Sequence, residues 1–116
     1  MSHRETRDAL AGMSGGEPDS IAQAVGLDAG ALDVSPLPGR TVALVRIATL
    51  IALDAPPASY GRQVAAALES GASPEDILGV LRAVAPQVGT ARVVAAAPEL
   101  MLAMGMSLPE DAGGDA

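Results

Sequence analysis

The chain has 116 residues, an apolar content of 49% and a formal net charge of −7, which together predict a single folded domain. The acidic balance argues against nucleic-acid binding and against docking on an anionic membrane, because both need basic patches. With no cysteine and one histidine, the sequence excludes disulfides, thiol redox chemistry and a Cys- or His-rich metal site within one chain, and predicts a cofactor-free protein.

The apolar residues are unusual in kind, because the chain has no Phe, no Trp and only one Tyr. A core of Ala, Val, Leu, Ile and Met suits closely packed helices but buries less area per residue than aromatic side chains do. We therefore expect a marginal domain that self-associates. The longest apolar run, 42–53, is too short to span a bilayer and contains Arg46, so the sequence predicts a cytoplasmic protein without a membrane partner.

The first third of the chain is polar and rich in glycine. Residues 1–18 are predicted to be a flexible segment that holds at most a short frayed helix over 4–12. Polar caps followed by apolar residues then predict a short helix over 19–26. Residues 28–40 contain several glycines and prolines and are read as a connection.

Two helices are predicted in the middle of the chain. Residues 39–53 are apolar nearly all round, which indicates a helix buried in a core or in a subunit interface. The next helix, over 57–70, has Pro57 in its first turn, Tyr60 on its apolar stripe and Gly71 as its natural stop.

The clearest helix start lies in SPEDILGVLRAVAP, where Ser73 is a natural N-cap and Pro74 suits the first helical position. Pro86 is predicted to end that helix, and a last helix over 88–104 is predicted to kink or break at Pro98. No segment alternates like a strand. The predicted fold is therefore all-α, with a helical domain over 19–105 and a disordered acidic tail over 106–116.

The segments TVALVRIATLIAL and APPASYGRQVAAALESGASPEDILGVLRAVAPQVGTARVVAAA resemble the carboxymuconolactone decarboxylase family, which includes the AhpD-like proteins. The most distinctive run is AALESGASPEDILGVLRAVAPQVG, in which an Ala-rich helix ends at Gly and a Pro-started helix begins with acidic residues. The resemblance covers roughly two-thirds of the chain. It implies an AhpD-like helical fold and a homo-oligomer, a trimer or a hexamer.

The residues that carry chemistry in this family are replaced here. The peroxidase branch has a C-x-x-C-x-x-x-H motif, which falls on Pro56, Ser59 and Gln63 of this sequence, and an upstream Glu, whereas this chain has no Glu between Glu17 and Glu69. Thiol peroxidase chemistry is excluded, because it needs a thiolate with a base one helical turn away.

The decarboxylase branch also departs from this sequence. It too places a His at Gln63, with acidic residues at about Ala58 and Ser59. The family resemblance suggests a lyase, but general acid–base catalysis by that set is absent, so the sequence leaves open whether the protein is an enzyme.

Five residues are candidates for binding a small ligand: Arg46, Ser59, Tyr60, Gln63 and Arg92. Ser59, Tyr60 and Gln63 share the first turns of one helix, where they can form a polar pocket. In the alternative interpretation, Ser59 caps the helix, Tyr60 packs with its hydroxyl at the surface, and Gln63 faces solvent. Arg46 interrupts an apolar helix, where a charge is costly unless paired. It either clamps the carboxylate of a substrate or forms a structural ion pair, for instance across a subunit interface with Asp54, Glu69 or Glu75. Arg92 raises the same choice or simply faces solvent.

Two functions follow from these observations. The first is a cofactor-free enzyme or binding protein for a small acidic or lactone-like metabolite. The second is a non-catalytic scaffold or partner-binding module on the same fold. The loss of the family's Cys, His and Glu favours the second, whereas Arg46 near a Tyr/Gln turn favours the first.

Overall fold

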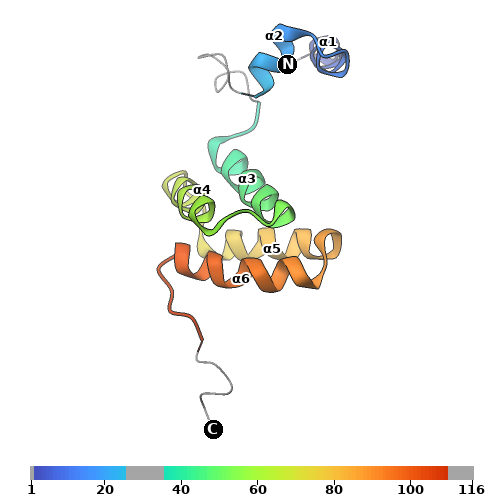
Figure 1. Cartoon of the computed structure of the whole chain (residues 1–116). Coiled ribbons are helices and arrows are strands. Elements are labelled where there is room, and N and C mark those ends of the chain that lie inside the picture. Colours follow the sequence, from blue (N-terminus) through green and yellow to red (C-terminus); the bar gives the residue numbers. More distant parts are fainter. Residues whose placement is uncertain (1, 26–35, 110–116) are drawn as a thin grey trace. The chain divides into compact units, whose positions relative to one another are not determined.

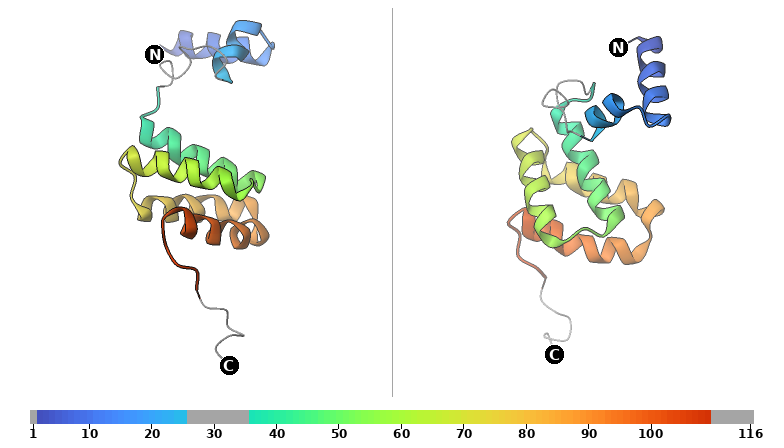
Figure 2. Two further views of the ribbon diagram at one scale, coloured as in Figure 1. Left: turned by 60° about the vertical axis from the view of Figure 1, so that its left-hand side comes forward. Right: turned by 45° about the horizontal axis from the view of Figure 1, so that its top comes forward.

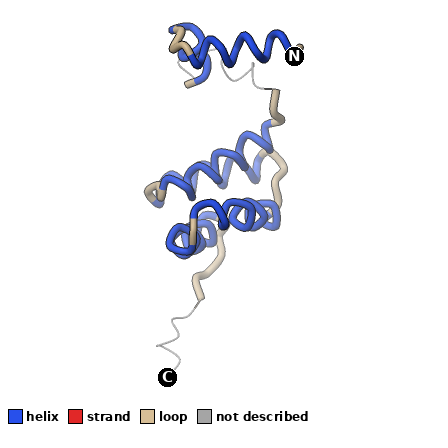
Figure 3. The backbone as a smooth tube through the Cα atoms, turned by 90° about the vertical axis from the view of Figure 1, so that its right-hand side faces the viewer, coloured by secondary structure: helices blue, strands red, loops and turns tan. Residues whose placement is uncertain are grey.

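A computed structural model describes residues 2–25 and 36–109. Within these ranges the regular secondary structure is entirely helical, which confirms the predicted all-α class (Figures 1 and 3). The helices are α1 (His3–Ser14), α2 (Pro18–Ala24), α3 (Gly39–Leu53), α4 (Pro57–Glu69), α5 (Pro74–Val88) and α6 (Thr90–Ala103). The chain divides into two compact units, residues 1–38 and 39–116.

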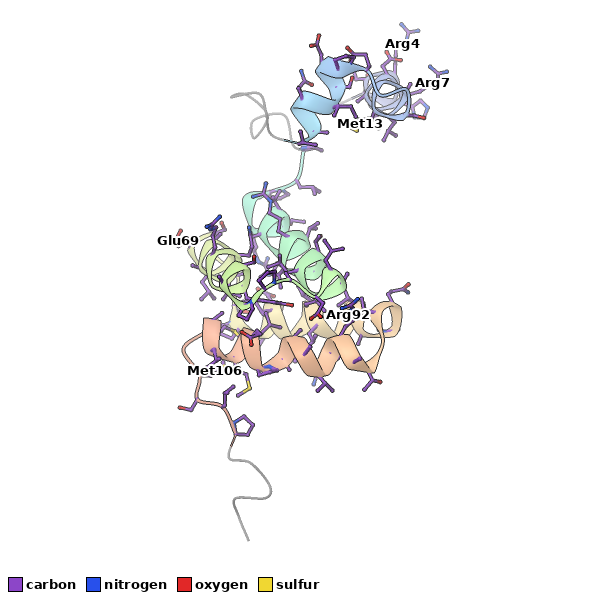
Figure 4. The ribbon with its side chains drawn as sticks, viewed as in Figure 1. Arg4, Arg7, Met13, Glu69, Arg92 and Met106 are labelled. Atoms are coloured by element: carbon purple, nitrogen blue, oxygen red, sulfur yellow. The ribbon has the colours of Figure 1, made fainter. Side chains whose placement is uncertain are left out.

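The first unit contains a helical hairpin, α1 and α2. Helix α1 begins at His3 and is longer than the 4–12 range that the sequence predicted, because the Ser2 hydroxyl accepts the Glu5 backbone N–H at 3.1 Å and caps the first turn. A Cβ at Gly12 would collide with the hydroxyl of Ser20, so a larger residue at this position requires the Ser20 side chain to move. Neither helix contains a buried residue. Figure 4 labels Arg4 and Arg7 on α1.

The second unit is built from α3 to α6 in two layers (Figure 2). Helices α3 and α4 form one layer and pack side by side, and α5 and α6 form the other. Helix α3 also packs on α5, and α4 packs on α6, so each layer covers the apolar face of the other. The tail predicted over 106–116 extends beyond the described residues from position 110 onward.

The core of the second unit is small and almost free of aromatic side chains. Its largest fully buried side chains are those of Ile47, Ile51, Val64 and Ile77, and Tyr60 is its one aromatic member. Burial of each of these aliphatic side chains contributes about 1.5–3 kcal/mol. Large apolar side chains such as Leu53, which is 72% exposed, remain outside this core.

The start of α5 agrees with the sequence prediction. The Ser73 hydroxyl accepts the Asp76 backbone N–H at 3.0 Å, and the Asp76 carboxylate accepts the Ser73 backbone N–H at 2.9 Å, which is a capping box. The same carboxylate lies 2.7 Å from the guanidinium of Arg40. These contacts fix the first turn of α3 beside the first turn of α5.

Neither internal proline ends its helix, whereas the sequence predicted an end at Pro86 and a kink or a break at Pro98. Helix α5 continues through Pro86 to Val88, because the proline stands in the last turn and removes only one backbone hydrogen bond there. Helix α6 continues through Pro98 to Ala103 without a break. Buried Ala96 and Leu100 on either side of Pro98 hold α6 against its neighbours.

Candidate functional site

The candidate site begins at the turn between α3 and α4. Asp54 has a φ of 53°, a left-handed conformation that is usual for glycine but uncommon for a residue with a side chain. The Asp54 N–H donates to the Ile51 carbonyl at 3.3 Å, and the Ala55 N–H donates to the Leu50 carbonyl at 3.0 Å. This is a Schellman closure with Asp in the glycine position. The turn therefore carries backbone strain of the kind that gathers at functional sites.

An ion pair ties this turn to helix α6. The Arg92 guanidinium lies 3.2 Å from the Asp54 carboxylate, and the two side chains are 43% and 56% exposed. Arg92 stands in the first turn of α6, and Figure 4 shows it beside the end of α3. The structure thus gives Arg92 a specific partner.

Tyr60 places a phenol at the same end of the unit. The residue lies in the first turn of α4 and is only 2% exposed, and among the described residues its hydroxyl has no hydrogen-bond partner. Burial raises the pKa of Tyr60, the charges of Asp54 and Glu99 raise it further, and Arg92 opposes them. No fully buried side-chain polar atom in the described ranges lacks a partner, so the ring lies in the core and the hydroxyl reaches its edge.

Glu99 completes the polar cluster. It follows Arg92 by seven residues on α6, so both side chains lie on one face of that helix, two turns apart. Sequence reasoning missed Glu99, although this spacing could have pointed to it, and considered Asp54 only as a partner for Arg46. The cluster of Asp54, Tyr60, Arg92 and Glu99 is called the tyrosine site below. Its formal charge is −1, from two carboxylates and one guanidinium.

Comparison of the sequence with models of known protein families identifies the family of this chain. The model of the carboxymuconolactone decarboxylase family matches residues 18–100. The chain belongs to this family. Neither the curated proteins nor the solved structures gave a significant match.

In this family member, the positions of the Cys and His motif surround Tyr60. Pro56 is the N-cap residue of α4 and makes no side-chain cap bond, and Ser59 and Gln63 are half-buried on the same helix. Ser59 therefore lies inside the helix and does not cap it. A helix begins here, as the family motif requires, but the chain has no thiol, and its single imidazole, His3, belongs to α1 and not to this helix.

Arg46 lies elsewhere. It is exposed in the single chain and, within the described ranges, has no ion-pair partner, because no other helix of the unit covers that face of α3. The expectation of a buried charge is therefore wrong for the isolated chain. Arg46 precedes Asp54 by eight residues, which corresponds to about 12 Å along the helix axis. The structure does not bring it into the tyrosine site.

Two further results bear on what the described residues can hold. In the ranges 2–25 and 36–109, no three side chains of the His, Cys, Asp and Glu types gather closely enough to bind a metal ion. No described helix is long and apolar enough to cross a bilayer. The tyrosine site offers one phenol and one guanidinium as donors and two carboxylates as acceptors.

Proposed function

We propose that this protein is a homo-oligomeric carboxymuconolactone decarboxylase-family protein, a trimer or a hexamer, that binds a small lactone-like metabolite at the tyrosine site. The observation that carries the proposal is Tyr60. A phenol whose ring is buried, and whose hydroxyl has no partner among the described residues, is prepared to donate a hydrogen bond to a ligand.

The chemistry of the site favours a carbonyl group as the ligand's acceptor. Burial and the two carboxylates raise the pKa of Tyr60, so the hydroxyl stays protonated at neutral pH and donates. A lactone carbonyl oxygen accepts this bond, and Arg92 offers a second donor at the rim. The carboxylates of Asp54 and Glu99 accept from any hydroxyl group on the ligand.

The charge of the site separates the two ligand classes that the sequence indicated. A carboxylate ligand would meet two carboxylates and a single guanidinium that is already paired with one of them at 3.2 Å. Like charges repel, so an acidic ligand binds less well than a neutral one of the same size. A neutral lactone avoids this repulsion and still uses both donors.

Isothermal calorimetry with a matched pair of ligands tests this proposal. The neutral ligand is γ-butyrolactone and the acidic ligand is its ring-opened form, 4-hydroxybutyrate. We expect the wild type to bind the lactone more tightly than the acid. We expect Tyr60→Phe to weaken lactone binding by roughly five- to tenfold, the value of one neutral hydrogen bond of about 1–1.4 kcal/mol.

Arg62→Ala is the control, because Arg62 is exposed on the same helix and is not part of the tyrosine site. It should bind the lactone as the wild type does. Equal lactone affinity in the wild type and in Tyr60→Phe, with thermal melts that show both folded, would refute the proposed role of Tyr60. Tighter binding of 4-hydroxybutyrate than of the lactone would show that the site prefers an acidic ligand to a neutral one.

A scaffold function is the second candidate. It is supported by the absence of the family's Cys, His and Glu set and by the large apolar side chains that the single unit leaves exposed, such as Val45 and Leu102. Under this alternative the protein assembles but neither ligand produces heat in the calorimeter. Multi-angle light scattering of the same samples measures the mass, so assembly and ligand binding are tested separately.

A further inference from the structure

An apolar groove lies between α5 and α6, on residues that the tyrosine site does not use. Its volume is about 410 Å³, and nine of its ten lining residues are apolar. Leu78, Met101, Met104 and Met106 are among them, and methionine side chains adapt readily to the shape of a partner. Figure 4 labels Met106, which follows the end of α6. We call this surface the α5–α6 groove.

The groove has a single charged lining residue, Glu75. Its carboxylate is exposed in the first turn of α5 and has no ion-pair partner among the described residues. Its neighbour Asp76 is already engaged by Arg40 and by the Ser73 backbone. An apolar partner that carries one cation would therefore satisfy both the groove and its rim.

The outer face of α3 has the complementary composition. Val45, Arg46, Thr49 and Leu53 are exposed and recur at helical spacing along one side of the helix. The Thr49 hydroxyl donates to the Val45 carbonyl at 3.0 Å, so this hydroxyl is satisfied within the helix. The face therefore presents apolar surface with one unpaired charge, the guanidinium of Arg46. We call it the α3 face.

We propose that the α3 face of one protomer docks in the α5–α6 groove of a second copy of this chain, with Arg46 paired to Glu75 of that copy. This inference rests on the homo-oligomer in the proposed function and names the surfaces that build it. A second copy fits because each apolar surface carries one charge and the two charges are opposite. Burial against each other removes both surfaces from water.

The two surfaces share no residue, so each protomer can offer its α3 face to one neighbour and its groove to another, which is a heterologous contact. A heterologous contact leaves one free face and one free groove on every pair, and it closes into a ring when the rotation between protomers allows. A trimer is the smallest such ring. The same arrangement explains how a charged residue can stand on this apolar face. In the single chain the Arg46 guanidinium is exposed to water, and when a second copy covers it, the carboxylate of Glu75 compensates its charge.

A charge-swap experiment with light scattering tests the interface. Arg46→Glu places two carboxylates at the contact, and Glu75→Arg places two guanidinium groups there. Each single variant should shift the dissociation midpoint to a concentration at least about 30-fold higher than that of the wild type, because a desolvated charge loses its partner. The double variant restores opposite charges in reversed order and should recover assembly.

Two controls make the same charge changes away from both surfaces. Arg62→Glu and Glu69→Arg alter exposed residues of α4 and should leave the mass unchanged. The milder variants Arg46→Gln and Glu75→Gln, with circular dichroism for each variant, keep the test valid where a charge reversal disturbs folding.

The outcomes separate the two proposals. An assembled wild type whose mass responds to neither Arg46 nor Glu75, or a double variant that stays dissociated, would overturn the interface and leave the homo-oligomer standing. A wild type that is monomeric at micromolar concentration would overturn both the interface and the homo-oligomer, whereas lactone binding is judged independently by calorimetry.

Discussion

The strained turn at Asp54 gives a sharp prediction about stability. Asp54 has a φ of 53° and occupies the glycine position of a Schellman closure. The variants Asp54→Gly and Asp54→Ala both remove the carboxylate, and they differ in how well the new residue tolerates a left-handed backbone and in its freedom in the unfolded chain. Comparison of the two variants therefore isolates the backbone strain from the ion pair with Arg92.

The magnitude follows from two opposing contributions. In the folded state, a residue with a Cβ costs about 1–2 kcal/mol relative to glycine in the left-handed conformation. The greater freedom of glycine in the unfolded chain lowers the stability of the glycine variant by about 0.5–1 kcal/mol, which offsets part of that advantage. Asp54→Gly should therefore be more stable than Asp54→Ala by about 0.5–1 kcal/mol. Both lose the exposed Arg92 ion pair, which contributes no more than about 1 kcal/mol.

Urea unfolding followed by circular dichroism measures this difference. All samples must be at one protein concentration, because self-association makes apparent stability depend on concentration. Thermal melts should agree, since 1 kcal/mol corresponds to about 4–8 °C in a unit of this size. An Asp54→Ala protein as stable as Asp54→Gly would show that the turn is not held in the left-handed conformation.

Three further predictions concern the core and the start of α5. Ile77→Ala should destabilise the unit by about 2–5 kcal/mol, because Ile77 is fully buried. The control Val94→Ala, at a position that is 67% exposed, should cost less than about 0.5 kcal/mol. Similar urea midpoints for the two variants would contradict the assigned core. Ser73→Ala should lose about 1 kcal/mol by calorimetry, and an equal loss in Ser70→Ala, which caps no helix start, would argue against the capping box. The hydrogen bond from the Ser73 backbone N–H, and then that from Arg40, lower the pKa of Asp76 below its ordinary value of 3.8. The Asp76 carboxylate therefore stabilises the fold above that pH, and this stabilisation is lost as the pH falls through the lowered pKa. Thermal melts of the wild type at acid pH should show the loss, and the melting temperature of Asp76→Asn should depend less on pH.

Local signals carried most of the fold from sequence to structure. The start of α5 is encoded within four residues by Ser73, Pro74 and Asp76, and the structure forms that capping box. The effect of Pro86 was misjudged, because a proline near the end of a helix removes one bond and does not stop the remaining turn. The predicted limits of the domain, 19–105, stay a prediction.

The candidate site was less predictable, because it is assembled from distant segments. Asp54 and Arg92 are 38 positions apart, and the packing of α6 against α3 and α4 brings them within 3.2 Å. Periodicity also could not show that the outer face of α3 is uncovered, so it placed Arg46 in a buried setting when the single chain exposes it. Tyr60 was a candidate from the sequence because a lone tyrosine on an apolar stripe is visible there, and its role in binding stays a prediction.

The most direct test of the tyrosine site is an alkaline titration of the native protein followed by the near-ultraviolet absorbance of tyrosinate, because Tyr60 is the only tyrosine and the chain has no tryptophan. We predict a titration midpoint above 10.0, and a lower midpoint in folded Asp54→Asn and Glu99→Gln, since burial and these two charges raise the pKa of Tyr60. A native protein that titrates at the ordinary value of about 10, with no response to either substitution, would show that the hydroxyl does not face these carboxylates and would contradict the site.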